Sequence, residues 1–236
     1  LRNTLRYQLS NLFDFDPAKH AVPDENLTGL DRWILAEFSK LETDVLKAFD
    51  AYEFHVVYQK LSQFAAVELS SIYHDTVKDR LYTDSANSQR RRSTQTALHR
   101  MVTALCQMLA PILSFTADEA WEFIPGKPTD SVHLSIWQPR LFGLSPEEQF
   151  SWQTFFKYRE RILPELEKAR QRKTIGKSLE AKIIFTPDLD TPNAIVSGRE
   201  QFQELLNVSQ YEPTSGEATL VIKVEHADGQ KCERCW

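Results

Sequence analysis

The sequence predicts a mainly α protein in which a helical bundle is followed by a small α+β appendage with a cysteine-containing turn at its end. Three observations predict this fold class. Apolar residues in the first half recur at the three-and-four spacing of amphipathic helices. Two segments rich in β-branched residues, 181–186 and 218–224, lie near the other end of the chain. The composition, 42% hydrophobic and 26% charged, is that of a globular protein.

The first half is expected to form helices with short connections, as in an up-and-down bundle. The apolar stripes predict helices over 1–12, 30–49, 54–72 and 98–112. Thr28 or Asp31 is available as the N-cap of the second of these helices. The segment Thr116–Glu119 has the pattern of a capping box and predicts the start of a further short helix.

The second half is predicted to combine helices with short strands. Ser145 and Pro146, followed by two glutamates, predict a strong helix start. This helix is expected to run to about Lys173, with a kink at Pro164. A short helix that carries Phe202 lies between the two predicted strands. We therefore expect three regions: a bundle at 1–140, a long helix with a small α+β domain at 141–225, and half of a metal-type motif at 226–236.

No catalytic centre is expected in these residues. Gly176-Lys177-Ser178 resembles the end of a phosphate-binding loop, but the first glycine of that pattern is replaced by Gln171 and no strand precedes it. Nucleophile-elbow, zinc-protease and dinucleotide-binding signatures are absent from the sequence. The six histidines share no spacing that would suggest a ligand set.

Composition also limits where the protein works. No apolar run approaches the roughly eighteen residues that a membrane helix needs, so no membrane partner is expected. Three cysteines in 236 residues suggest a reducing compartment, which predicts a cytoplasmic protein. The chain begins Leu-Arg-Asn without an initiator methionine, which suggests a fragment of something longer. Cys106 lies on an apolar helical stripe and is expected to be a core residue.

Charge is unevenly distributed. The formal net charge is −5, which argues against wholesale coating of nucleic acid. Residues 157–182 nevertheless carry nine basic side chains against four acidic ones. A second basic cluster, Arg90–Arg92, is expected to precede a helix. Such runs are usually solvated surface charges, and they point to nucleic acid only with other support.

Cys232 and Cys235 form the one metal-type motif, C-x-x-C. Two thiolates are half of the tetrahedral shell that structural zinc requires, with His226 as a third candidate ligand. The alternative is a redox pair, but a thioredoxin-like pattern is missing. The motif therefore predicts a truncated zinc-binding turn.

Several motifs resemble one known family in order along the chain. The run Leu109–Trp121, of sequence LAPILSFTADEAW, looks like the signature of the anticodon-binding bundle of class Ia aminoacyl-tRNA synthetases. The entry to the chain, Arg2–Tyr7, and the segments 11–15, 30–33, 78–82 and 90–96 resemble the same region. Within the class, Ile175–Ala181 and the terminal Lys231–Trp236 are similar to bacterial isoleucyl-tRNA synthetases. Valyl enzymes end in a coiled coil, for which no heptads are present, and leucyl enzymes lack this C-x-x-C.

The resemblance implies an anticodon-recognition piece of a ligase. The parent would join isoleucine to its tRNA with ATP and Mg²⁺ and hydrolyse mischarged valine in a separate domain. The HIGH and KMSKS signatures are absent from these residues, so the piece alone is expected to be inactive. The resemblance further implies zinc in the parent, the anticodon stem-loop of tRNA(Ile) as partner, and a monomer. The family's second C-x-x-C pair is absent from this sequence, which leaves a half-site.

Basic and amide side chains in three places are candidate tRNA contacts, because unpaired anticodon bases are read by hydrogen bonds, stacking and phosphate contacts. These are Arg2, Asn3 and Arg6, then Arg90, Arg91 and Arg92, then Arg170, Arg172, Lys173 and Lys177. Arg234 and Trp236 flank the cysteine turn and could contact and stack on a base, or Trp236 could simply cover the metal. The competing hypothesis is a stand-alone helical interaction protein with a redox or metal tail, and an enzyme with its own active site is a third.

Overall fold

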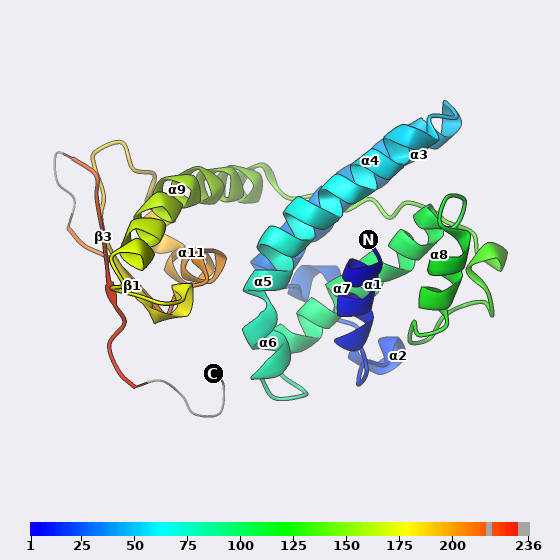
Figure 1. Ribbon diagram of the computed structural model, residues 1–236, viewed down its shortest axis with the longest axis horizontal. Coiled ribbons are helices and arrows are strands. Elements are labelled where there is room, and N and C mark those ends of the chain that lie inside the picture. Colours follow the sequence, from blue (N-terminus) through cyan, green and yellow to red (C-terminus); the bar gives the residue numbers. More distant parts are fainter. Residues whose placement is uncertain (216–218, 231–236) are drawn as a thin grey trace. The chain divides into compact units, whose positions relative to one another are not determined.

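The computed structural model describes residues 1–215 and 219–230. The chain divides into two compact units, Leu1–Leu144 and Ser145–Trp236, which are coloured from blue to green and from green to red in Figure 1. The predicted boundary after residue 140 lies close to this division, and the predicted boundary after 225 lies within a strand, β3 (Val221–His226). The mainly α fold class with a small α+β appendage is confirmed.

The first unit is helical from Arg2 to Trp121, with short connections, and ends in a mostly non-helical segment that contains one short 3-10 turn. Its elements are α1 (Arg2–Ser10), α2 (Pro17–His20), η1 (Asp24–Asn26), α3 (Gly29–Asp50), α4 (Phe54–Phe64), η2 (Ala65–Tyr73), α5 (His74–Thr76), α6 (Lys78–Tyr82), α7 (Gln89–Leu109), α8 (Ser114–Trp121) and η3 (Val132–Leu134). Helix α3 packs against α4 and α7, and the paired α3 and α4 extend beyond the other helices in Figure 1. The predicted apolar stripes form the core: Ile34, Leu61 and Leu98 are fully buried, as is Cys106.

Two helices begin where the sequence did not place them. Helix α7 starts at Gln89, with the Ser88 hydroxyl accepting from Arg91 N, so Arg90–Arg92 form its first turn and do not precede it. Helix α8 starts at Ser114 without a side-chain cap, so the capping box predicted at Thr116 is wrong. The carboxylate of Asp118 instead accepts from Ser131 Oγ at 2.7 Å and from Val132 N at 3.0 Å, which fastens the following loop.

The second unit packs a long helix against a three-stranded sheet. The elements are α9 (Pro146–Gln171), η4 (Ser178–Glu180), β1 (Ala181–Thr186), α10 (Asn193–Ser197), α11 (Arg199–Leu206), β2 (Gln210–Pro213) and β3. The predicted helix start at Ser145 is confirmed and takes the form of a capping box with Glu148, and the helix continues through Pro164. The sheet order is β2-β1-β3, with β1 parallel to β2 and antiparallel to β3.

Aromatic rings fill the core between the sheet and helices of the second unit. Phe202 stacks on Phe155 with ring centroids 5.4 Å apart and meets Tyr211 edge-on at 5.2 Å. Gly198 lies against Phe155, and a Cβ there would approach Phe155 Cζ to 2.6 Å and the Ala194 carbonyl oxygen to 2.7 Å. The core of this unit is therefore closely packed and leaves no room for a larger residue at that point.

Candidate nucleic-acid interface

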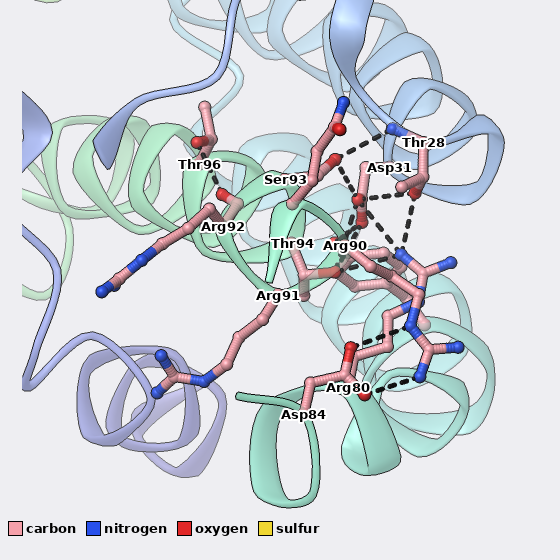
Figure 2. Close-up of polar contacts among 12 residues, drawn as sticks. Thr28, Asp31, Arg80, Asp84, Arg90, Arg91, Arg92, Ser93, Thr94 and Thr96 are labelled. Atoms are coloured by element: carbon pink, nitrogen blue, oxygen red, sulfur yellow. Dashed lines mark hydrogen bonds and ion pairs between the residues drawn. The ribbon is translucent and has the colours of Figure 1, made fainter. Parts of the chain in front are cut away.

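A buried polar cluster around Asp31 joins α3, η2, α6 and α7 of the first unit (Figure 2). The Asp31 carboxylate is completely buried and accepts hydrogen bonds from Tyr73 Oη at 2.6 Å and Ser93 Oγ at 2.5 Å. Thr94 Oγ1 donates to it at 3.1 Å, and Arg80 Nη1 lies 3.2 Å away. Burial and the neighbouring carboxylate raise the pKa of Tyr73, so its hydroxyl stays a donor. The cluster fixes the start of α7 against α3.

A second polar cluster attaches the turn after α1, at Asp14, to the first turn of α7. Arg91 forms a bidentate pair with Asp14, at 2.6 and 2.9 Å. Arg92 Nη1 donates to the Asp14 carbonyl at 3.0 Å and to Gln95 Oε1 at 2.7 Å. The hydrogen bond from Arg91, above all, lowers the pKa of Asp14 to about 2.

Asp14 gives a testable pH dependence. Because its pKa is lower in the folded chain than its ordinary value of 3.8, the carboxylate stabilises the fold above that value, and this stabilisation is lost as the pH falls towards about 2. We expect Asp14→Asn to be less stable than wild type at neutral pH and to lose less stability between pH 3.8 and 2. Urea unfolding across this range measures both effects. Equal pH dependence in the two proteins would contradict the assignment.

These contacts correct the interpretation of the Arg90–Arg92 cluster as three phosphate contacts. Arg91 is 5% exposed and faces Asp14, so it is not available to a phosphate. Arg90 makes a bidentate pair with Asp84, at 2.9 and 2.8 Å, on the surface. In Figure 2, Arg91 and Arg92 point away from the Asp31 cluster, whereas Arg90 turns towards Asp84. The spacing of residues along the chain cannot predict these acidic partners, because Asp14 and Asp84 lie in turns outside α7.

The buried face of α7 also positions the loop that follows α2. Thr96 Oγ1 accepts from Val22 N at 3.0 Å, and Ser93 Oγ accepts from Thr28 N at 2.9 Å. Asp16 caps α2 by accepting from Ala18 N at 3.0 Å. The loop is therefore held at both ends by side chains, which orients the groups that it presents to solvent.

Between this loop and α7 lies a polar hollow of about 460 Å³, which we call the α2/α7 hollow. It is lined by Lys19, His20, Ala21, Val22, Pro23, Asn26, Asn87, Gln89 and Arg92. Amides, a lysine and a histidine offer both donors and acceptors, as base edges and phosphates require. Arg92 Nε is buried there without a partner among the described residues.

Two aromatic rings near helix ends of the first unit are exposed to solvent. Phe13 is 82% exposed, with the Arg91 guanidinium 5.9 Å from its ring centre, and Tyr82, at the end of α6, is 64% exposed. Exposed rings are suitable platforms for stacked bases. The sequence alone does not single out these two rings, nor the hollow's Lys19, His20, Asn26, Asn87 and Gln89. Their position in loops and at helix ends could have indicated them, because binding residues occur disproportionately in such segments.

The α1 candidates lie on the surface. Arg2 Nη2 donates to both carboxylate oxygens of Glu119 of α8, at 2.7 and 2.8 Å, with both side chains more than half exposed. Asn3 and Arg6 are also exposed, and Arg6 has no ion pair within the described chain. A small hollow of about 130 Å³ lies beside Arg2 and Arg6, against Phe123. An unpaired surface arginine is suited to a phosphate.

The candidates of the second unit lie at the end of α9. Arg170 is paired with Glu167 at 3.1 Å and also contacts Ser178 Oγ. Arg172 and Lys173 are exposed, and Lys173 has a positive φ of 59°. The Gly176 N–H donates to Glu180 Oε2 at 2.7 Å, so a carboxylate occupies the position that a phosphate would need in the rejected loop motif. Lys177 lies in the same exposed turn.

The cysteine turn lies outside the described residues. Cys232, Cys235, Arg234 and Trp236 all belong to the segment 231–236, so their predicted roles stay predictions. His226, at the end of β3, is exposed. Within residues 1–215 and 219–230, no group of three or more histidine, cysteine or acidic side chains could hold a metal ion. No described helix is both long and apolar enough to cross a membrane.

The sequence was compared with protein-family models and with known proteins. A family model described as the anticodon-binding domain of tRNA ligase matches residues 31–185, which is more than half of the chain. The chain belongs to the anticodon-binding domain family of tRNA ligases. The matched residues include α3, α7 and the buried cluster between them, so the family's helical region is the part that carries the Asp31 contacts.

Three relatives of this anticodon-binding domain are isoleucine–tRNA ligases that are several times its length. The chain is 41% identical to isoleucine–tRNA ligases of Syntrophotalea carbinolica and Geobacillus thermodenitrificans, and 39% identical to that of Pectobacterium carotovorum. Each match covers 100% of this chain and 27% of the relative. The chain therefore spans about a quarter of the length of these relatives.

Proposed function

We propose that this anticodon-binding domain recognises the anticodon stem-loop of tRNA(Ile) as part of an isoleucine–tRNA ligase. The observation that carries the proposal is the similarity of the whole chain to isoleucine–tRNA ligases together with the family match. The α2/α7 hollow supplies hydrogen-bonding groups for unpaired bases, and the exposed rings of Phe13 and Tyr82 supply stacking surfaces. Arg6, Arg172 and Lys173 supply exposed charge for phosphates.

The activity of the whole ligase is part of the same proposal. The parent joins isoleucine to tRNA with ATP and Mg²⁺ and removes mischarged valine, in the cytoplasm and as a monomer. The nucleotide-binding signatures are absent from this sequence, so the chain alone forms no aminoacyl-adenylate. Zinc in the parent is held by Cys232 and Cys235 with further ligands, because two thiolates complete only half of a tetrahedral site.

Filter binding tests the proposal with tRNAs that differ in anticodon. We expect the chain to prefer tRNA carrying the isoleucine anticodon, with an affinity that falls steeply as salt rises. Arg6→Ala should weaken binding and reduce the salt slope by about one, since it removes one phosphate contact. Lys47→Ala, which removes an exposed lysine from α3, serves as the control and should leave the slope unchanged.

Two outcomes would count against this function. Equal binding of all tRNAs would support charge attraction without anticodon recognition. No binding at low salt would favour the alternative of a helical interaction protein, whose partner is not RNA.

A further inference from the structure

The turn that joins α3 to α4 carries a group of exposed aromatic rings, Tyr52, Phe54 and Tyr58, which we call the tip patch. Tyr52 is 82% exposed, Tyr58 51% and Phe54 45%. Phe54 meets both Phe49 and Tyr52 edge-on, with ring centroids 5.9 and 6.3 Å apart. The half-buried Trp137 supports the group through an edge contact with Phe49 at 6.3 Å. The patch therefore covers the end of the two helices that extend beyond the others of this unit in Figure 1.

Tyr52 occupies a backbone position that usually belongs to glycine. Helix α3 ends in a Schellman motif, in which Glu53 N donates to the Ala48 carbonyl at 2.8 Å and Tyr52 N to the Phe49 carbonyl at 2.9 Å. The motif requires a left-handed residue, and Tyr52 accordingly has a φ of 58°. A residue with a Cβ is strained there, and an exposed ring gains no burial in return. Neither backbone preference nor core packing explains this tyrosine, which points to a contact made by its ring.

The charges of the tip do not suit nucleic acid. Within residues 46–58 the charged side chains are Asp50, Glu53 and Lys47, and all three are exposed. Two carboxylates against one ammonium disfavour a phosphate backbone, which is held by an excess of basic groups. An aromatic centre with a charged rim is instead the usual composition of a protein–protein interface. We therefore look for a protein surface as the occupant of the tip patch.

The exposed area of the tip patch decides what kind of protein surface covers it. Fully burying one aromatic side chain removes about 150–250 Å² from water, so the exposed parts of the three rings together amount to roughly 350 Å². A separate protein with a standard interface needs about 800 Å² on each side. A surface in the same polypeptide needs less, because the covalent connection keeps it near at an effective concentration of about millimolar. The area therefore favours an occupant that is joined to this chain.

We propose that the tip patch docks on the part of the isoleucine–tRNA ligase that lies outside these 236 residues, with Tyr52 as the central anchor. The inference rests on the proposed function, because it requires the remainder of that ligase. The match to the Syntrophotalea carbinolica ligase covers 27% of that protein, so most of such a ligase lies outside this chain. The surface that receives the tip is apolar at its centre and basic at its rim, which complements Asp50 and Glu53.

Hydroxyl-radical footprinting, read by mass spectrometry without tRNA, tests the docking by comparing this chain with the intact ligase. We expect the oxidation rate of Tyr52 to be about fivefold lower in the intact ligase, because a docked anchor loses most of its 82% exposure. Tyr82, which is 64% exposed on α6, is the internal control and should react equally in both proteins. Equal reactivity of Tyr52 in the two proteins, or an equal fall for both tyrosines, would overturn the proposal.

Two further outcomes would identify other occupants and would also overturn the proposal. If the reactivity of Tyr52 falls as the concentration of the 236-residue chain rises, the occupant is a second copy of this chain. If Tyr52 of the intact ligase is protected only after tRNA is added, the occupant is RNA.

Tyr52→Gly separates docking from stability. Glycine adopts a φ of 58° without strain, so we expect the variant chain to fold and to unfold at a higher urea concentration than wild type. In the intact ligase, the protection of Phe54 relative to the chain with the same substitution should be lost. Tyr82→Ala removes an exposed ring elsewhere and should leave the protection of Phe54 in place. A lower urea midpoint for Tyr52→Gly, or retained protection of Phe54, would overturn the role of Tyr52 as the anchor.

The two proposals fail in different measurements. Filter binding without anticodon preference would end the proposed function, and it does not involve the tip patch. An unchanged reactivity of Tyr52 in a ligase whose 236-residue chain still selects its tRNA would end the docking proposal alone.

Discussion

Replacing Asp31 with alanine is expected to lower the free energy of unfolding of the Leu1–Leu144 unit by about 3–5 kcal/mol. The carboxylate is fully buried and is the shared acceptor for Tyr73, Ser93 and Thr94. Its loss leaves the 2%-exposed Arg80 without its buried counter-charge and several donors without their acceptor. Urea unfolding followed by far-UV circular dichroism measures the change.

Asp44→Ala provides the matched control on the same helix. Asp44 is paired with Lys60 at 2.8 Å, but both side chains are well exposed, so we expect a change of about 1 kcal/mol or less. Similar losses in the two variants would show that burial does not set the strength of the Asp31 contacts. A large loss for Asp31→Ala alone would support its role in fixing α7 to α3.

Replacing Phe202 with alanine is expected to destabilise the second unit by about 3–5 kcal/mol. The ring is fully buried, stacked on Phe155 and edge-on to Tyr211, so its removal leaves a cavity that the sheet and α9 cannot readily close. Denaturant unfolding measures the loss.

Phe150→Ala removes the same ring from the surface of α9. Phe150 is 58% exposed, and we expect its truncation to change stability by about 0.5 kcal/mol or less. A comparable effect of both substitutions would mean that the Phe155–Phe202 stack contributes little to this unit.

The buried polar clusters link stability to the proposed binding surface. Ser93 and Thr96 hold the backbone of the loop after α2, and Arg91 and Arg92 hold Asp14, so α7 positions the groups of the α2/α7 hollow. Arg91 is thus a positioning residue of this region, and its charge is balanced by Asp14 instead of facing solvent.

The sequence by itself determined the elements whose signals are local. Apolar stripes predicted α3, and the range 54–72 that α4 and η2 occupy together, to within one residue, and Ser145 with the following glutamates predicted the start of α9. Helix periodicity and capping depend on residues close in the chain. Ordered motifs predicted the family for the same reason. They are runs of residues that can be compared without knowing their partners in space.

The tertiary structure alone decided which polar residues are inside. The first turns of α7 bury Arg91, Arg92 and Thr94, because Asp14 and Asp31 reach them from distant parts of the chain. Strand β2 was missed because it exists by pairing with β1, 28 residues away at Lys182–Gln210. The local sequence of a charged or short polar segment does not indicate whether the folded chain buries it. Its position depends on a hydrogen-bond or charge partner that only the folded chain brings close.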